Sequence, residues 1–162
     1  MTTLYHGTLD SLVPAILREG LKPRGDRPSH DAYMDSASIP TFVYLTTSYG
    51  LAVEHACRIS ERTADSAAIA VFELELDVLN KQLIYPDEDY LRYEWNSDFE
   101  DWTLKEQLSF MERKRDTWKE SLKDFKTIAY KSVIPAETLT DCLIPRWIEQ
   151  GYRRKFPKRR EA

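Results

Sequence analysis

Cysteine is nearly absent from this chain of 162 residues, which contains only Cys57 and Cys142. Two cysteines make no disulfide framework, and their positions do not show the spacing of metal ligands. We therefore expect two buried thiols in a reducing compartment, which favours a cytoplasmic protein without a metal site.

Long apolar runs are also missing from the sequence. No stretch approaches the roughly 20 apolar residues that a membrane-spanning helix needs. The first residues lack the pattern of a secretory signal, because His6, Asp10 and Pro14 interrupt them. We expect a protein that does not act at a membrane.

The remaining composition is typical of a soluble globular protein, with 42% hydrophobic and 31% charged residues. The net charge of −4 is unevenly distributed, because residues 151–162 carry six lysines and arginines against one glutamate. That segment has a charge of +5 and the rest of the chain −9. We predict one domain over residues 1–150 and a basic tail over 151–162, which is either a contact for nucleic acid or another acidic surface, or a solvated terminus.

The first 23 residues predict a strand followed by a helix. Residues 3–6 favour a short strand, and the helix after it has Pro14 in its first turn and Gly20 at its end. The motif Tyr5–Thr8 therefore lies at a strand–helix junction. Within this motif, Gly7 lets another backbone or a ligand approach closely.

A long connection and a second strand–helix unit follow. Residues 22–41 are rich in proline and charge, and a connection of this length is typical of a lid or binding loop. Residues 41–46 favour a strand, and Ser48 is suited to cap the next helix. Tyr44 and Thr47 thus lie near a second junction, and two such junctions can form one cleft.

The later segments predict further strands and a helical region. Alternation over residues 67–76 indicates a core strand, and apolar runs at 127–134 and 139–144 predict two more. Residues 95–125 favour helix, since they are rich in Glu, Lys and Arg and lack glycine and proline over 104–122. This succession of elements predicts an α+β fold.

The order of these motifs resembles the ADP-ribosyltransferase superfamily. The resemblance is carried by Tyr5–Thr8, by Ile16–Leu21, and by Val43–Thr46 with the small-residue helix after it. They are most similar to the His–Tyr–acid branch, which includes diphtheria-toxin-like enzymes, poly-ADP-ribose polymerases and small rifampin-modifying transferases. The RNA 2′-phosphotransferases are also similar. The resemblance implies a split β-sandwich with flanking helices, in which residues 95–125 would be a helical insertion.

The resemblance also implies that NAD⁺ binds as a substrate in a cleft between two sheets. His6 would hydrogen-bond the adenosine ribose, and Gly7 would offer its backbone to the nicotinamide amide. Tyr44 would stack on the nicotinamide ring, with His55 on its other side. The implied NAD⁺-binding residues are His6, Gly7, Thr8, Tyr44, Thr47 and His55.

The third element of the family is an acid that stabilises the positive charge developing on the ribose as the nicotinamide bond breaks. Many members carry it at the start of a late core strand, but the matching place near Thr127 has no acid. The candidates here are Asp87, Glu88 and Asp89, and the sequence does not choose among them. The alternative interpretation of these three residues is an acidic surface turn.

The leading hypothesis is an NAD-dependent mono-ADP-ribosyltransferase that releases nicotinamide and modifies a protein or nucleic acid. The first alternative is an RNA 2′-phosphotransferase relative, for which Arg24, Arg27 and His30 are the phosphate-binding candidates. The second is a catalytically silent NAD-binding module that acts through protein contacts, and a third is hydrolysis of NAD⁺ by water. A toxin, a defence protein and a housekeeping modifier all fit this sequence.

Overall fold

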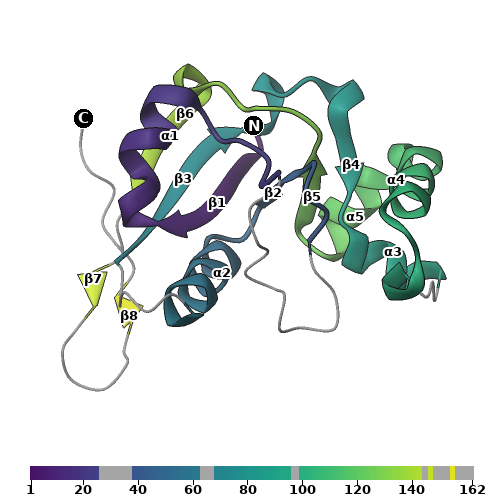
Figure 1. The fold of residues 1–162 in the computed structure, drawn as a ribbon. Coiled ribbons are helices and arrows are strands. Elements are labelled where there is room, and N and C mark those ends of the chain that lie inside the picture. Colours follow the sequence, from purple (N-terminus) through teal and green to yellow (C-terminus); the bar gives the residue numbers. More distant parts are fainter. Residues whose placement is uncertain (26–37, 63–67, 96–98, 144–145, 148–153, 156–162) are drawn as a thin grey trace.

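A computed structural model of the chain describes residues 1–25, 38–62, 68–95, 99–143, 146–147 and 154–155 (Figure 1). The strands are β1 (Thr3–Leu9), β2 (Val43–Thr46), β3 (Ile69–Glu75), β4 (Ile84–Pro86), β5 (Thr127–Tyr130), β6 (Leu139–Leu143), β7 (Arg146–Trp147) and β8 (Arg154–Lys155). The α-helices are α1 (Val13–Glu19), α2 (Tyr49–Arg62), α3 (Glu88–Trp95), α4 (Leu104–Arg113) and α5 (Trp118–Asp124). Six strands form one antiparallel sheet in the order β4-β5-β2-β1-β3-β6, so the predicted α+β fold is confirmed.

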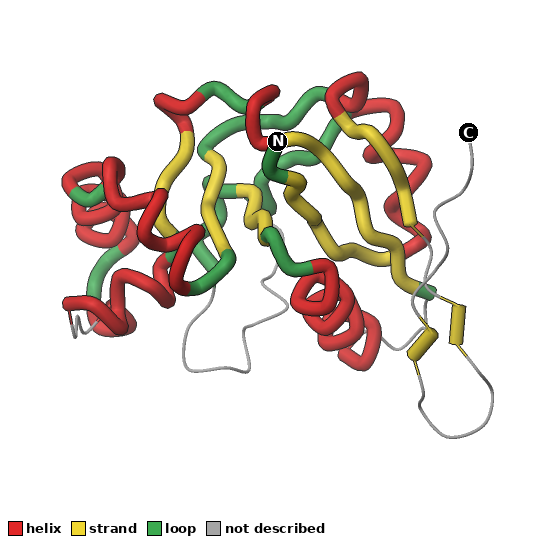
Figure 2. The backbone as a smooth tube through the Cα atoms, turned by 180° about the vertical axis from the view of Figure 1, so that it is seen from behind, coloured by secondary structure: helices red, strands yellow, loops and turns green. Residues whose placement is uncertain are grey.

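The sheet divides between β1 and β2. These two strands are paired only at Tyr5 and Thr46, whereas β1 pairs with β3 along its whole length and β2 pairs with β5 along its own. The halves β4-β5-β2 and β1-β3-β6 therefore diverge on either side of one contact. Figure 2 shows these two groups of strands from behind, with α3, α4 and α5 gathered at one end of the sheet.

Hydrophobic packing follows this division. One face of the sheet is covered by a continuous core that crosses both halves and is closed by α1 and α5. Its side chains include Leu4, Leu45, Phe72, Leu74, Ile84 and Ile128. On the opposite face, α2 packs on β1 and β3, and the helices after β4 pack around Phe42, Tyr85 and Ala129. Two separate cores on that face leave room for a site between them.

The close contact of α2 with β1 depends on Gly7. A Cβ atom at this position would lie 1.9 Å from the backbone oxygen of Ala52. Such a distance is far below van der Waals contact, so a side chain at Gly7 would force the helix away from the strand. The small residue Ala56 lies next to the same spot, 3.1 Å from that Cβ position.

Some predicted boundaries differ from the structure. The strand expected over residues 127–134 ends at Tyr130, and Ile134 instead forms an isolated bridge with Leu21. Helix α3 was not predicted, because its acidic first turn is indistinguishable in sequence from a surface turn. Cys57 is buried as expected, but Cys142 is only half-buried on the edge strand β6. Among the described helices, none combines the length and apolar character needed to cross a membrane.

Candidate active site

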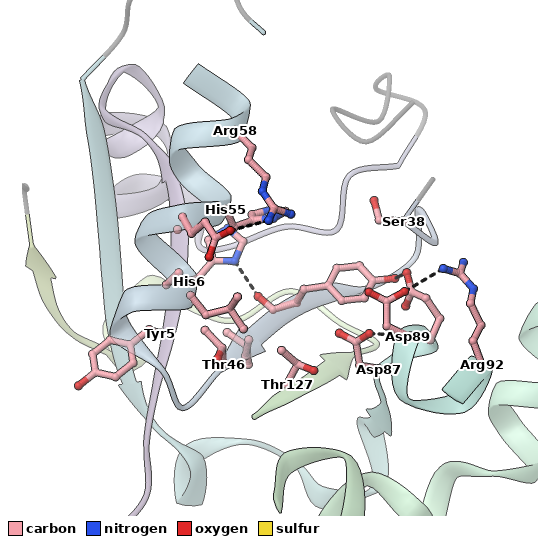
Figure 3. Close-up of a pocket in the computed structure, with 17 residues that line it drawn as sticks. Tyr5, His6, Ser38, Thr46, His55, Arg58, Asp87, Asp89, Arg92 and Thr127 are labelled. Atoms are coloured by element: carbon pink, nitrogen blue, oxygen red, sulfur yellow. Dashed lines mark hydrogen bonds and ion pairs between the residues drawn. The ribbon is translucent and has the colours of Figure 1, made fainter. Parts of the chain in front are cut away.

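A cavity of about 440 Å³ opens where the two halves of the sheet diverge. This volume lies within the range of small-molecule sites. One wall comes from β1 and α2, the floor from β2 and Thr127 at the start of β5, and the other wall from the start of α3 (Figure 3). Residues that are far apart in sequence therefore face one another across this space.

His6 is held at the wall of this cavity by the backbone of β2. Its Nδ1 lies 2.9 Å from the carbonyl oxygen of Tyr44. Burial is the main cause that lowers the pKa of His6 to about 4, so the imidazole is neutral at pH 7. Because a carbonyl only accepts, Nδ1 carries the proton, and Nε2 is left as a hydrogen-bond acceptor.

Tyr44 contacts the other half of the site through its hydroxyl group. This hydroxyl donates to Oε1 of Glu88 at 2.8 Å and accepts from the backbone N–H of Ile39 at 2.9 Å. Burial, and then the neighbouring carboxylates of Glu88 and Asp87, raise the pKa of Tyr44 well above its usual value. The phenol therefore stays protonated and remains a donor.

The three acids at the start of α3 have different environments. Asp87 is 8% exposed and caps α3, because its Oδ1 accepts from the backbone N–H of Asp89 at 2.9 Å. The Asp89 side chain is 70% exposed and pairs with Arg92 at 2.8 Å. Glu88 is 6% exposed, faces Tyr44, and its Oε2 is buried without a hydrogen-bond partner among the described residues. Of the three, Glu88 is the carboxylate with an unoccupied oxygen at the cavity.

Electrostatics in this acidic turn favour proton uptake. Burial, and then the Asp87 carboxylate, raise the pKa of Glu88, whereas the hydrogen bond from Tyr44 opposes the rise. Burial and the charge of Asp89 likewise raise the pKa of Asp87. Two adjacent buried carboxylates behave as one coupled pair that binds its first proton readily.

The position of this turn depends on Ser121 of α5, which the sequence analysis did not single out. Ser121 is fully buried, its Oγ accepts from the backbone N–H of Asp87 at 3.0 Å, and it donates to the carbonyl of Thr127 at 2.8 Å. One hydroxyl thus ties α3 to β5. A single serine within a polar helix gives no sequence signal of this role.

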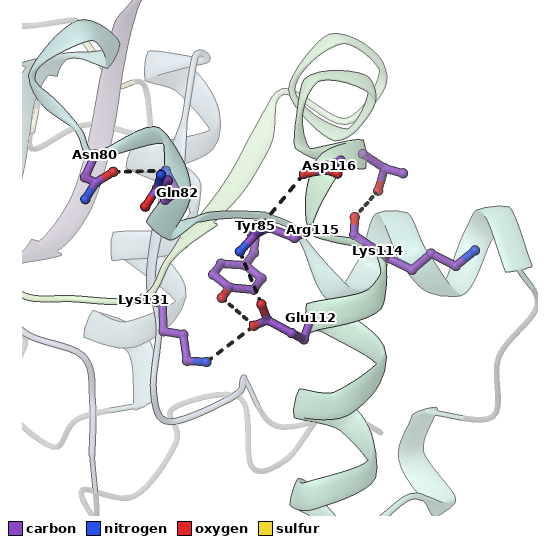
Figure 4. A network of polar contacts seen from close by, with 9 residues as sticks. Asn80, Gln82, Tyr85, Glu112, Lys114, Arg115, Asp116 and Lys131 are labelled. Atoms are coloured by element: carbon purple, nitrogen blue, oxygen red, sulfur yellow. Dashed lines mark hydrogen bonds and ion pairs between the residues drawn. The ribbon is translucent and has the colours of Figure 1, made fainter.

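A second tyrosine–glutamate pair lies outside the cavity and joins β4 to α4 (Figure 4). The hydroxyl of Tyr85 donates to Oε2 of Glu112 at 2.6 Å, and Nη1 of Arg115 lies 3.2 Å from Oε1 of the same carboxylate. Burial and this bond raise the pKa of Tyr85 to about 12.

Two arginines line the cavity from opposite walls. Arg58 on α2 pairs with Glu54 one turn earlier, and Arg92 on α3 pairs with Asp89. Figure 3 shows Arg58 and His55 on the α2 side, across the space from Arg92. The site therefore contains cationic groups near both walls, each balanced by an acid of its own helix.

The structure brings most of the sequence-predicted residues together and leaves two apart. The predicted residues that line the cavity are His6, Gly7, Tyr44, His55, Asp87, Glu88 and Asp89. They include neither Thr8, which is buried within β1, nor Thr47, whose backbone N–H donates to the carbonyl of Lys126 at 2.8 Å. Thr46, which was not predicted, lines the cavity instead, because it is the residue at which β2 meets β1.

Of the three phosphate-binding candidates, the structure describes Arg24, which does not line this cavity. Nη2 of Arg24 donates a hydrogen bond to the carbonyl oxygen of Ser38 at 2.6 Å. Arg27 and His30 lie outside the described residues. Within the described ranges, no group of three His, Cys, Asp or Glu side chains is arranged to hold a metal ion.

The six-stranded sheet and its helices match the fold of an ADP-ribosyltransferase toxin. A solved structure with this fold is EcPltA, which superimposes with a TM-score of 0.56 over 97% of this chain and 83% of that chain. The two sequences are 12% identical, so the likeness establishes the fold. The predicted resemblance is thus confirmed at the level of the fold. No family model and no curated protein matches the sequence.

Proposed function

We propose that this protein is an NAD-dependent mono-ADP-ribosyltransferase that transfers ADP-ribose to a macromolecular acceptor and releases nicotinamide. The observation that carries the proposal is the hydrogen-bonded series from His6 to the Tyr44 backbone and from the Tyr44 hydroxyl to Glu88 at one cavity. A histidine, a tyrosine and an acid from three distant segments are the set that the family resemblance implies.

Glu88 is the acid we assign to the reaction. Breaking the bond between nicotinamide and the ribose C1′ sends the bonding electron pair to nicotinamide and leaves positive charge on the ribose. An ionised carboxylate in a dry site stabilises that charge strongly. The acceptor then forms the new bond to C1′ and loses a proton. The buried and unpartnered Oε2 of Glu88 supports this assignment.

His6 and Tyr44 are assigned to substrate binding. With Nδ1–H donated to the Tyr44 carbonyl, Nε2 of His6 is an acceptor suited to a ribose hydroxyl. The ring of Tyr44 lines the floor of the cavity and offers an aromatic face for nicotinamide, while His55 lines the wall formed by α2. Holding the dinucleotide in this way supplies orientation, which is a large part of catalysis by such a site.

The acceptor is proposed to be a protein or a nucleic acid. The likeness to the fold of an ADP-ribosyltransferase toxin supports a macromolecular target, and so does the uneven charge, with +5 on residues 151–162 and −9 elsewhere. A basic segment contacts acidic surfaces without contributing to the chemistry.

The test is incubation of the purified chain with NAD⁺ labelled in the adenylate part, followed by measurement of nicotinamide release and of label in added protein, DNA and RNA. We expect nicotinamide release and label in one macromolecular pool, both lost in Glu88→Gln. NAD⁺ binding without nicotinamide release would point to a silent binding module. Release without label transfer would indicate hydrolysis, and turnover of an RNA 2′-phosphate would favour the phosphotransferase alternative.

A further inference from the structure

Tyr44 occupies a central position in the hydrogen bonds of the cavity. Its carbonyl oxygen accepts from His6, and its hydroxyl group donates to Glu88. Stacking on a ring requires neither of these bonds. The hydroxyl therefore has a function of its own, separate from that of the aromatic face.

We propose that the Tyr44 hydroxyl is a positioning group for Glu88, which fixes the direction of its carboxylate and favours its ionised form. This inference rests on the proposed function, because it takes Glu88 as the acid of the reaction. It assigns to the tyrosine a second role that a phenylalanine cannot fill.

The surroundings of Glu88 explain why such a group is needed. The carboxylate is buried, Asp87 precedes it, and its second oxygen has no described partner. Among the described residues, the other titratable or charged groups that line the cavity are Asp87, which precedes α3, Asp89 and Arg92 from α3, Tyr44 from β2, Tyr5 and His6 from β1, and Glu54, His55 and Arg58 from α2. Arg92 pairs with Asp89 at 2.8 Å, and the Tyr44 hydroxyl donates a hydrogen bond to Glu88 at 2.8 Å.

The bond to Ile39 strengthens this donor. The backbone N–H of Ile39 donates to the hydroxyl oxygen of Tyr44, and that hydroxyl donates its proton to Glu88. A hydroxyl that accepts one hydrogen bond becomes a better donor in the next. The series N–H, O–H and carboxylate also fixes the rotation of the hydroxyl, because its oxygen and its proton are both occupied.

Tyr44→Phe tests the proposal, since it keeps the ring and removes only the hydroxyl. Tyr85→Phe is the matched control, because it removes another tyrosine–glutamate bond from the same sheet, to Glu112 and outside the cavity. Nicotinamide release is measured from pH 5 to pH 9, NAD⁺ affinity by titration calorimetry, and folding by thermal denaturation for the wild type and both variants.

For Tyr44→Phe we expect the acid side of the pH–rate profile to move up by about one pH unit, because loss of one charge-assisted donor disfavours the carboxylate. Nicotinamide release then falls about tenfold on the acid side, and the loss is smaller at the alkaline plateau, where only the orientation of the carboxylate is affected. NAD⁺ affinity stays within about twofold, since the ring is retained. Tyr85→Phe is expected to keep the wild-type profile. A wild-type profile in Tyr44→Phe, or an equal displacement in Tyr85→Phe, overturns the proposal.

A measurement without NAD⁺ separates this inference from the proposed function. The carboxyl ¹³C signal of Glu88, assigned by its loss in Glu88→Gln, is titrated in the wild type and in Tyr44→Phe. We expect the pKa of Glu88 to be higher by about one unit in Tyr44→Phe. An unchanged pKa overturns the positioning role even where the enzyme is active. A shifted pKa in a chain that releases no nicotinamide supports the hydrogen bond and rejects the proposed function.

Discussion

Individual side chains at the cavity differ in what burial does to them. Burial keeps His6 neutral and makes it an acceptor, keeps Tyr44 protonated and a donor, and raises the pKa of Glu88. These three effects have one cause, the desolvation of a charged form, and their directions follow from the sign of each charge. The chemical roles therefore follow from environment as much as from residue type.

Single substitutions separate the role of Glu88 from that of Asp89. Glu88→Gln is expected to lower nicotinamide release by on the order of 10²–10³-fold with little change in NAD⁺ affinity, because it removes the charge that stabilises the ribose cation. Asp89→Asn is expected to lower it only a few-fold, since its side chain is 70% exposed. Steady-state release and binding measurements decide between them, and a larger loss in Asp89→Asn than in Glu88→Gln would move the reacting acid to Asp89.

His6 makes stability depend on pH. Its pKa is about 4 in the folded protein and about 6.5 in the unfolded chain, so between these values the unfolded state binds a proton that the folded state does not. Above pH 6.5, His6 is neutral in both states and does not lower the free energy of unfolding. As the pH falls from 6.5 towards 4, proton uptake by the unfolded state lowers the free energy of unfolding. We expect the free energy of unfolding of the wild type to fall relative to that of His6→Gln by up to about 3 kcal/mol.

Urea denaturation of both proteins at pH 7.5, 5.5 and 4.5 measures this difference. The comparison with His6→Gln is needed because the raised pKa values of Asp87 and Glu88 act in the opposite direction, stabilising the fold as the pH falls. A difference that is constant with pH would mean that the imidazole is not desolvated.

Secondary-structure elements place these side chains through a few close contacts. Helix α2 lies against β1 because Gly7 has no side chain, and the start of α3 is fixed by the Ser121 hydroxyl of α5. Both contacts join segments that are far apart in the sequence. Gly7 therefore allows α2 to approach the sheet on one side of the cavity, and the Ser121 hydroxyl holds the start of α3 on the other side.

Gly7→Ala is expected to destabilise the fold by about 1–3 kcal/mol, because the new Cβ meets the Ala52 backbone and not a flexible side chain. Gly50→Ala is the matched control in the first turn of α2. Its Cβ would find only the Ser48 hydroxyl, at 3.9 Å, so we expect a gain of about 0.5–1 kcal/mol. Thermal and urea denaturation check both values, and equal stability of the two variants would contradict the packing described.

The whole chain combines a divided sheet with an uneven charge. Two half-sheets share one continuous core on one face and have separate cores on the other, so the division opens a cavity without breaking the fold. All described residues that line it fall between Tyr5 and Thr127. The basic segment after residue 150 therefore has no described part in this cavity.

Deleting residues 153–162 is expected to leave nicotinamide release within about twofold of the full chain. The deletion removes +5 of charge, so we expect weaker retention on a heparin column and a weaker dependence of acceptor labelling on salt. Release assays and salt titrations of labelling measure the two effects separately. Loss of nicotinamide release would show that the segment supports the domain.

The sequence predicted the strand–helix units around His6 and Tyr44 because periodicity, helix caps and glycine are local signals. Those signals predicted a helix after Ser48, and the structure contains α2 (Tyr49–Arg62) there. They missed α3, since an acidic first turn also fits a surface loop, and they included Thr47 where Thr46 lines the cavity. Whether Thr46 or Thr47 faces the cavity depends on the register of β2 against its partner strands, and local sequence signals do not specify that register.

Local sequence patterns were thus sufficient for the α+β class and for a cleft shared by two strand–helix junctions. The tertiary structure alone distinguished Glu88 from Asp87 and Asp89, because that choice depends on which carboxylate is buried against Tyr44. It also revealed the hydrogen bonds made by Ser121 and by the Tyr44 hydroxyl. Desolvation and hydrogen-bond partners arise from segments brought together in space, and no short stretch of sequence contains them.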